Sequence, residues 1–237
     1  MDFTNRHVVV TGGAGALGSA VVAALIADGA VCHVPCFDEA EAERFQFRDH
    51  RQVIVSVAGN LAEVASVSRV FADLPSLWAS IHIAGGFAFA ALRDTEVATL
   101  RQQIDMNFMS CILCCRAAVQ AMAAKAPDAG ASGRIVNIAA RPALEWRSGA
   151  NMAAYTASKA AVAALTVALA EEVAKDGILV NAVAPSTMDT PANRKAMPRA
   201  DYGLWPKVEE VAATILFLAS PDNRVTRGAI VPVYGKS

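Results

Sequence analysis

Short, continuously apolar runs alternate along the chain with longer stretches in which small apolar residues recur at helical spacing. The short runs predict β-strands buried on both faces, because a strand with one face in water alternates apolar and polar residues instead. We expect strands at residues 7–10, 31–34, 53–57, 81–84, 135–138, 179–183 and 230–233. We expect helices near residues 19–27, 61–72, 97–123, 152–174 and 208–219.

Strands that alternate with helices at this spacing indicate βαβ units. The predicted fold class is therefore α/β, a doubly wound parallel sheet with helices on both faces. At 237 residues the chain fits a single domain, residues 1–237. Segment 125–133, rich in small residues, predicts a loop. The irregular, proline-containing segment 186–206 predicts a substrate lid, because loops of this length in compact domains are usually functional.

Composition favours a large buried core. Apolar residues make up 54% of the chain and charged residues 18%, so ample apolar material is present to cover a sheet. The formal net charge of −1 argues against a non-specific nucleic-acid surface, which needs a basic excess. No apolar run has the expected length of a membrane span, and the polar start does not fit a secretory signal. We expect a cytoplasmic protein without nucleic-acid or membrane partners.

Neither the cysteines nor the histidines follow a metal-binding pattern along the sequence. The five cysteines form no two-pair motif and fit as small packing residues of a reducing compartment. They are Cys32, Cys36, Cys111, Cys114 and Cys115. The four histidines, at positions 7, 33, 50 and 82, are widely scattered. We expect no metal site.

A glycine-rich turn, in VVVTGGAGALGSAVVAAL, joins the first predicted strand to the first predicted helix. Three of its glycines satisfy G-x-G-x-x-G in the context that gives this motif meaning. Without β-carbons the backbone turns tightly and a pyrophosphate can approach it, while the helix N-terminus offers free N–H donors. The turn predicts a dinucleotide site. The expected contacts are Gly12, Gly13, Gly15, Ala16, Leu17 and Gly18.

The end of the second predicted strand bears on the choice between NAD and NADP. An acidic residue about 20 positions after the glycine motif normally accepts the ribose 2′-hydroxyl of NAD. Here Cys36 stands at the strand end and Asp38 follows, with no arginine at that end to hold a 2′-phosphate. Asp38 or Glu39 would repel a phosphate if it pointed inward, which favours NAD. Charges solvated at a helix start are the alternative interpretation.

Tyr155 and Lys159, in YTASK, are four residues apart on a predicted helix and share one face. A phenol with the usual pKa of about 10 is a poor acid–base catalyst at neutral pH. A nearby ammonium favours the phenolate, so we expect Lys159 to lower the pKa of Tyr155 toward a useful range. In a chain with a dinucleotide site, this pair indicates proton transfer.

These motifs together give the chain a resemblance to the short-chain dehydrogenase/reductase family over essentially its whole length. The matching pieces are TGGAGALG, HIAGG, IDMNFMS, GRIVNIAA, YTASKAAV, ILVNAVAPSTMDTP and TRGAIVPVYG. The resemblance implies a single-domain Rossmann-type fold and hydride transfer between NAD or NADP and a small-molecule substrate. It also implies assembly as a homodimer or homotetramer.

The resemblance further implies roles for individual residues. Tyr155 would be the general acid/base, Lys159 would hold the nicotinamide ribose and tune the tyrosine, and Asn107 would anchor a water path behind them. Thr190 would contact the nicotinamide carboxamide. The other cofactor contacts carried over are Cys36, Asp38, Asn60, Ala84, Gly85, Pro185 and Thr187.

The chain departs from the family pattern where a catalytic serine is expected, because NIAARP places Ala139 and Ala140 there. That hydroxyl normally hydrogen-bonds the reacting carbonyl oxygen, and losing such a donor costs roughly 10²–10³ in rate. Ser148 is either a displaced substitute or a solvated loop serine. The gap leaves three hypotheses: quinonoid dihydropteridine reduction, ordinary carbonyl/alcohol reductase-dehydrogenase chemistry, or a catalytically silent dinucleotide-binding sensor or scaffold.

The first hypothesis depends on a partial resemblance to the dihydropteridine reductases, which keep the Tyr–Lys pair without the serine. AGGF at residues 84–87 and MDTPANRKAMPRADYGLW at residues 188–205 carry it. Aromatic faces suit flat heterocycles and guanidinium groups suit acidic or polar substrates. The expected substrate contacts are Phe87, Arg141, Trp146 and Arg194; packing aromatics and a solvated basic rim are the alternatives.

Overall fold

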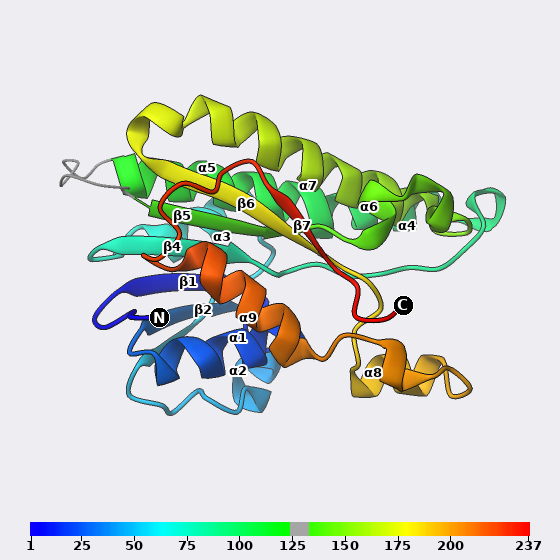
Figure 1. Cartoon of the computed structure of the whole chain (residues 1–237), viewed down its shortest axis with the longest axis horizontal. Coiled ribbons are helices and arrows are strands. Elements are labelled where there is room, and N and C mark those ends of the chain that lie inside the picture. The colour runs from blue at the N-terminus through cyan, green and yellow to red at the C-terminus, as the bar shows by residue number, and fades with distance from the viewer. Residues whose placement is uncertain (124–132) are drawn as a thin grey trace.

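The computed structural model, which describes residues 1–123 and 133–237, contains one parallel sheet with helices on both faces (Figure 1). The seven strands follow the order β3-β2-β1-β4-β5-β6-β7, so the direction of winding reverses between β1 and β4. Their bounds are β1 (His7–Thr11), β2 (Val31–Cys36), β3 (Val53–Val57), β4 (Leu77–His82), β5 (Gly133–Ile138), β6 (Ile178–Pro185) and β7 (Ile230–Val233). The prediction of a single-domain, doubly wound α/β fold is confirmed.

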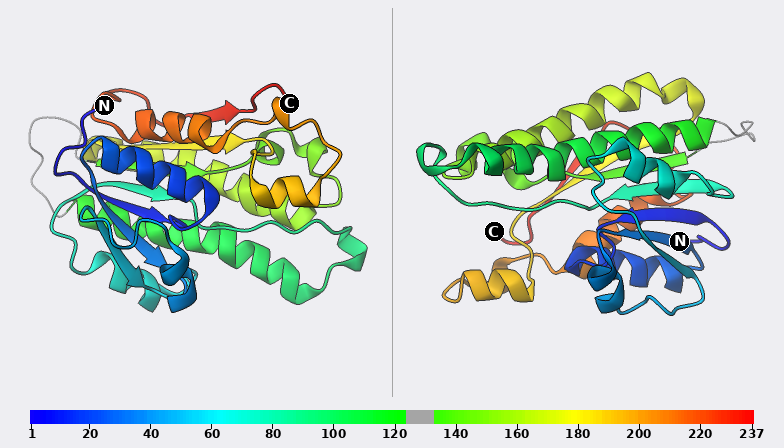
Figure 2. Two further views of the ribbon diagram at one scale, coloured as in Figure 1. Left: turned by 90° about the horizontal axis from the view of Figure 1, so that it is seen from below. Right: turned by 180° about the vertical axis from the view of Figure 1, so that it is seen from behind.

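Two groups of helices cover the sheet, each over its own apolar core. On one face lie α1 (Ala16–Ala27), α2 (Glu39–Arg44) and α9 (Val208–Ala219). On the other lie α3 (Val64–Phe71), α4 (Val97–Ile104), α5 (Ser110–Ala123) and α7 (Ala153–Glu172). Figures 1 and 2 show α5 and α7 running alongside each other across the sheet from α1 and α9. Strands covered on both faces explain the continuous apolar runs of the sequence.

The fourth strand differs from its prediction. It covers Leu77–His82 rather than residues 81–84, because Ile83 and Ala84 leave the sheet to bond the end of β1. The Ile83 N–H donates to the Thr11 carbonyl at 3.2 Å, and the Ala84 N–H donates to Thr11 Oγ1 at 3.2 Å. Trp78 and Ser80 interrupt the β-branched pattern that would have revealed the strand's start.

The structure also shows local order in segments that the sequence predicted only as irregular or as simple helix. Segment 186–206 contains α8 (Pro191–Ala196) and a 3₁₀ turn at Tyr202–Leu204, and α8 stands beyond the end of the sheet in both figures. Residues 125–132 of the predicted loop lie outside the described residues, and Gly133 begins β5. The predicted helix 97–123 is continuous but contains a π-helical turn at Asp105–Met109.

Two helical stretches correct the expectation that no apolar run reaches membrane-span length. Val97–Ala123 and Ala153–Glu172 are long and apolar enough by length and composition alone, although core helices of globular folds meet the same criterion. In this fold both pack on one face of the sheet, and each carries small apolar residues beyond those that face the core.

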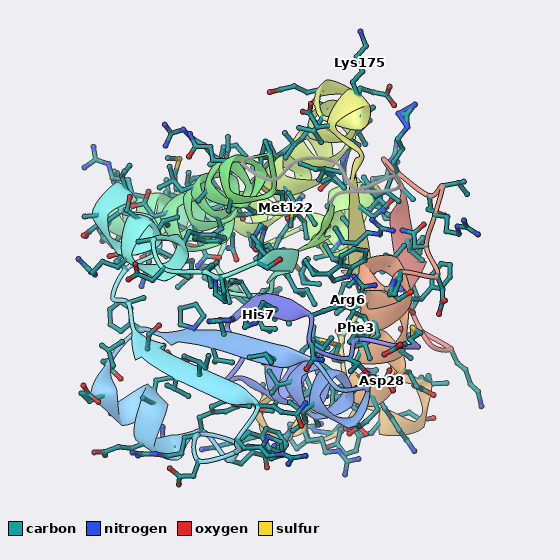
Figure 3. The ribbon with its side chains drawn as sticks, turned by 90° about the vertical axis from the view of Figure 1, so that its left-hand side faces the viewer. Phe3, Arg6, His7, Asp28, Met122 and Lys175 are labelled. Carbon is teal, nitrogen blue, oxygen red and sulfur yellow. The ribbon has the colours of Figure 1, made fainter. Side chains whose placement is uncertain are left out.

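The amino ends of the strands form a packed end of the molecule, which faces the viewer in Figure 3. The Arg6 guanidinium lies 3.8 Å from the centre of the Trp78 ring, and the buried Arg134 guanidinium lies 4.9 Å from it. The Trp78 indole N–H donates to the Ala219 carbonyl at 2.9 Å. The side chains at this end pack against one another. In doubly wound folds ligands bind at the carboxyl ends of the strands, so we expect the ligand-binding site there.

The glycine turn between β1 and α1 depends on two close approaches. Gly12 has a φ of 66°, and a β-carbon there would lie 2.8 Å from the Ala84 nitrogen. A β-carbon on Gly18 would overlap the carbonyl oxygen of Gly12. The turn thus holds the start of α1 against both its own strand and the segment after β4.

We predict that Gly18→Ala lowers the free energy of unfolding by about 1–3 kcal/mol, because the added methyl group must displace backbone. Gly15→Ala is the matched control, since its β-carbon would lie 3.3 Å from the Gly12 carbonyl oxygen and Gly15 is exposed at the start of α1. Urea denaturation measures both. Equal stability of Gly18→Ala and wild type would contradict this account of the turn.

Candidate active site

The carboxyl ends of the parallel strands bring the predicted site residues to one edge of the sheet. The register aligns Thr11 of β1 with His82 of β4, His82 with Asn137 of β5, and Asn137 with Ala182 of β6. The segments that leave these strand ends include the glycine turn, residues 83–87, residues 139–149 and segment 186–206. Ligands of doubly wound folds bind at this edge, near the point where strand order reverses.

The residues of the glycine turn separate into exposed and buried positions. Gly15 and Ala16 are exposed at the N-terminus of α1, where the first N–H groups of a helix have no carbonyl within the helix to bind. Gly13, Leu17 and Gly18 are buried, and Leu17 belongs to the core beneath α1. The Gly15 N–H donates to the Gly12 carbonyl at 3.1 Å, so the donors left for a ligand are the first N–H groups of α1 itself. With the helix dipole they suit a pyrophosphate, while the Leu17 side chain serves packing.

Residues expected near the adenosine ribose are engaged in local contacts. Cys36 is buried at the end of β2. Asp38 begins α2, where its carboxylate accepts a hydrogen bond from the Glu41 N–H at 2.7 Å, and Glu41 in turn accepts one from the Phe37 N–H. Asn60 likewise accepts a hydrogen bond from the Ala62 N–H at 3.0 Å. Asp38 and Asn60 thus cap local turns, and α2 begins with clustered negative charge.

Tyr155 and Lys159 occupy successive turns of α7, as their spacing predicts. The Lys159 ammonium is buried and donates a hydrogen bond to the Ile138 carbonyl oxygen, at the end of β5, at 2.8 Å. The Tyr155 ring is half-buried, and Phe87 packs against its edge at 5.0 Å between ring centroids. Within the described part of the chain the Tyr155 hydroxyl has no hydrogen-bond partner, so it is free to meet a substrate.

Asn107 lies within the π-helical turn and is buried beside Lys159. Its side-chain amide accepts a hydrogen bond from the Gly86 N–H and donates one to the Gly86 carbonyl, both at 3.0 Å. Gly85 passes between the two side chains: a β-carbon there would lie 3.4 Å from Lys159 Nζ and would overlap Asn107 Oδ1. Asn107 therefore positions the chain segment that follows β4, and π-helical turns are frequent at functional sites.

Burial shifts the pKa of both groups on α7. It raises the pKa of the Tyr155 phenol to about 12 and lowers the pKa of the Lys159 ammonium to about 8. The expectation that Lys159 lowers the tyrosine pKa is wrong for this structure, because desolvation dominates and the ammonium is directed to Ile138. At neutral pH the phenol is protonated and suited to donate a proton.

No hydroxyl stands where the family's serine is expected. Ala139 and Ala140 are both buried, and the Ala139 N–H donates to the Val183 carbonyl as a continuation of the sheet. Ala140 immediately precedes the short helix α6 (Arg141–Leu144). Ser148 is exposed, and its hydroxyl donates to the Glu145 carbonyl at 2.8 Å. These contacts favour the interpretation of Ser148 as a loop serine.

The predicted basic substrate contacts already have acidic partners. Arg141 pairs with Glu145 at 2.7 Å and lies 5.0 Å from the Tyr234 ring. Arg194 of α8 forms two hydrogen bonds to Asp189, at 2.6 and 2.7 Å. The arrangement agrees with a solvated rim more than with free cations that await an acidic substrate.

Aromatic residues at the rim are strongly exposed. The exposed fractions of Phe87, Phe89 and Trp146 are 59%, 64% and 73%. Phe87 and Phe89 lie 6.5 Å apart between ring centroids, and Trp146 donates its indole N–H to the Ala143 carbonyl at 3.0 Å. Phe87 contacts Tyr155 directly, and exposed aromatic faces of this kind are suited to a substrate with an apolar ring.

The chain segment after β6 supplies the remaining predicted contacts. Pro185 ends β6, and Thr187 follows in a half-buried position. Thr190 caps α8, where its hydroxyl accepts a hydrogen bond from the Asn193 N–H at 3.2 Å. Sequence reasoning missed the Ile138 carbonyl and the Gly86 backbone, since main-chain partners leave no signal in residue type.

Comparisons with known proteins identify the family of this chain. The short chain dehydrogenase family model matches residues 6–201. The cis-4-hydroxycyclohexanecarboxylate dehydrogenase of Sinomonas cyclohexanicum is 34% identical over 249 residues, covering 98% of this chain and 96% of the relative. The 2-dehydro-3-deoxy-L-rhamnonate dehydrogenase (NAD(+)) of Sphingomonas sp. (strain SKA58) is 30% identical over 249 residues, covering 98% and 95%.

A solved structure of a short chain dehydrogenase/reductase family protein matches with a TM-score of 0.88 at 28% identity, covering 99% of this chain and 98% of that one. The chain belongs to the short-chain dehydrogenase/reductase family. It is therefore an NAD(P)-dependent oxidoreductase of that family.

We predict that Lys159→Met removes a pH dependence from stability. An unfolded lysine keeps a pKa of about 10.4, whereas burial lowers that of Lys159 to about 8. Between these values the unfolded chain binds more protons, so rising pH stabilises the native state. Relative to the variant, wild type should gain roughly 2 kcal/mol from pH 7 to pH 9.5. Urea denaturation at both pH values measures this, and parallel curves for the two proteins would contradict it.

Proposed function

We propose that the protein is an NAD-linked reductase-dehydrogenase that interconverts a carbonyl group and a secondary alcohol on a small, ring-bearing substrate. The observation that carries the proposal is the Tyr155–Lys159 pair at the carboxyl end of β5, with a partner-free phenol at the rim and a buried ammonium behind it. The exposed donors at the start of α1 lie on the same edge of the sheet.

A nicotinamide bound along the glycine turn would supply or take the hydride. Gly15, which has no side chain, would let its pyrophosphate approach, and the N–H groups that begin at Ala16 would bind it at the N-terminus of α1. The Tyr155 phenol, protonated at neutral pH, would donate its proton to the carbonyl oxygen during reduction and take it back during oxidation. Lys159 would place a positive charge behind the phenolate that forms, and Asn107 would keep residues 84–86 aligned beside the reacting groups.

The start of α2 supports NAD over NADP. Asp38, Glu39 and Glu41 place negative charge where the second strand ends, and a 2′-phosphate there would meet repulsion rather than an arginine clamp. The relative from Sphingomonas carries NAD(+) in its name. The ratio of kcat/KM for NADH and NADPH in the assay described below tests this preference.

The rim supports a substrate with an apolar ring. Phe87, Phe89 and Trp146 offer exposed aromatic faces, while Arg141 and Arg194 are paired with carboxylates. The relative from Sinomonas acts, by its name, on a ring that carries a secondary hydroxyl. Lid residues of segment 186–206 would cover such a ring from the other side.

Quinonoid dihydropteridine reduction is the second candidate, and one observation favours it. Ala139 and Ala140 leave the site without a hydroxyl to polarise a carbonyl, whereas a quinonoid ring is already polarised for hydride. Neither relative named above is a pteridine reductase, so the alcohol and carbonyl chemistry takes precedence.

We also propose that α5 and α7 contribute to a homodimer or homotetramer contact. Both helices lie on an outer face of the molecule and carry more alanine, valine and leucine than their core-facing sides use, including the 45%-exposed Val167. Light scattering after gel filtration measures the mass, and a monomer at working concentration would overturn the proposal.

Tyr155→Phe tests the proton-transfer role. We expect NADH-dependent reduction of a panel of cyclic ketones, and any reduction of quinonoid dihydropterin, to fall about 10²–10⁴-fold in kcat, because the proton donor is lost. NADH affinity, measured by fluorescence titration, should change little and serves as the folding control. Unchanged turnover in Tyr155→Phe would overturn the assignment, and turnover of the pterin alone would select the second candidate.

Ala140→Ser tests whether a hydroxyl is truly missing. We expect ketone reduction to rise, by up to about 10²-fold, because the new hydroxyl can bond the carbonyl oxygen in the transition state. Ala139→Ser is the matched control, since Ala139 packs in a buried cluster with Ala163 and Ala182. A rise in neither variant would show that another group already polarises the substrate.

A further inference from the structure

Behind the proposed active site lies a buried cluster that the mechanism does not use. Its members are His82 at the end of β4 and Cys111 and Cys115, one turn apart on α5. The ligand-type atoms of these three residues lie within 4.8 Å of one another, and all three side chains are buried. Asn137 of β5, which is fully buried and pairs with His82 across the sheet, faces the same point.

The distances among these atoms resemble the edges of a coordination tetrahedron. Cys115 Sγ lies 3.4 Å from His82 Nδ1, and both sulfurs lie 3.4 Å from Asn137 Oδ1. His82 Nδ1 lies 2.8 Å from the same oxygen. With Zn–S near 2.3 Å and Zn–N near 2.0–2.1 Å, a tetrahedral site has edges of roughly 3.4–3.8 Å. Small outward shifts of the imidazole and the amide would therefore accommodate an ion.

The hydrogen bonds within this cluster are crowded around the Asn137 carbonyl oxygen. The Asn137 NH₂ group donates to Thr166 Oγ1 at 2.9 Å, which directs Oδ1 toward the cluster. Because His82 Nδ1 faces that oxygen at 2.8 Å, Nδ1 carries a proton in this state. Oδ1 then faces three donors, the imidazole N–H and two thiols, although a carbonyl oxygen has two lone pairs.

The surroundings also provide the support that a metal-bound histidine requires. His82 Nε2 lies 2.8 Å from Ser80 Oγ, and a hydroxyl can either donate or accept. If the ring proton moves to Nε2, it donates to Ser80 and leaves Nδ1 free as a ligand, as is usual for metal-bound imidazoles. A divalent ion that displaces both thiol protons forms a neutral unit with two thiolates, which suits a buried position.

We propose that His82, Cys111 and Cys115 bind a borderline-soft divalent cation of the zinc type, with the Asn137 carbonyl oxygen as the fourth ligand. On binding, the two thiols lose their protons to solvent, and the His82 proton moves from Nδ1 to Nε2. Two thiolates and an imidazole are a typical zinc donor set. Cys111 follows Asn107 by one helical turn, and Asn137 is followed by Ile138, whose carbonyl accepts the bond from Lys159. The ion would therefore join the two chain segments that surround Lys159.

The test is metal content and spectrum, neither of which depends on turnover. The full chain is expressed in zinc-supplemented minimal medium, purified without chelators and analysed by mass spectrometry for metals. We expect about one zinc per chain in wild type. We expect loss of that zinc in Cys115→Ser and in His82→Asn. Cys114→Ser is the matched control, because Cys114 is a buried thiol of the same helix outside the cluster.

Cobalt in place of zinc gives a second measurement on wild type alone, which decides the question even if a ligand variant fails to fold. We expect the visible bands of tetrahedral Co²⁺ and a thiolate-to-cobalt charge-transfer band in the near ultraviolet. Wild-type zinc no higher than in Cys115→Ser would overturn the proposal. So would equal loss of zinc in Cys114→Ser, or a cobalt spectrum without the thiolate band.

Discussion

The buried ammonium of Lys159 sets the position of most groups in the site. A cation taken from water must receive oxygen partners in exchange, and the Ile138 carbonyl supplies one at 2.8 Å. This bond ties α7 to the end of β5 and so holds Tyr155, one turn earlier on α7, at the carboxyl edge of the sheet. Gly85 passes so close to Lys159 and Asn107 that a β-carbon there would overlap Asn107 Oδ1 and touch Lys159 Nζ. Helix α7, the end of β5 and the segment that contains Gly85 thus all lie against the ammonium of Lys159.

The glycine turn packs against backbone at the same edge of the sheet. Gly12 approaches the backbone of Ala84 because the segment after β4 bonds Thr11 rather than continuing the sheet. The same segment then runs to Gly86, which Asn107 clamps through both of its main-chain groups. The predicted dinucleotide turn and the predicted proton-transfer pair are therefore mechanically linked by a stretch of residues 83–86. The described contacts thus join the glycine turn to Asn107 and Lys159 through this backbone and not through a direct contact between the two motifs.

Patterns confined to neighbouring residues predicted the fold class, the glycine turn and the pairing of Tyr155 with Lys159. Each depends on spacing within one element or on one turn between two elements, which the sequence displays directly. Features that depend on packing between distant elements were missed or wrong. The Tyr155 pKa had the wrong direction, because burial and the bond from Lys159 to Ile138 are properties of the assembled site. The gathering of His82 with Cys111 and Cys115 was missed because β4 and α5 meet only in the folded chain.

The core changes from apolar to polar directly behind the reacting groups. Val9, Ile135 and Val180 fill the middle of the sheet beside Ser80, whereas His82 and Asn137 occupy its carboxyl end. Apolar residues of similar volume would avoid the cost of leaving buried donors and acceptors imperfectly paired. Buried polar residues at this position can do what apolar residues cannot: their directional hydrogen bonds fix the orientation of neighbouring groups. Asn137 of β5 is bonded to His82 and Thr166, and the carbonyl of the next residue, Ile138, accepts the hydrogen bond from Lys159 of α7. The polar layer and the carbonyl oxygen that holds the buried ammonium are therefore anchored at one strand end, on adjacent residues.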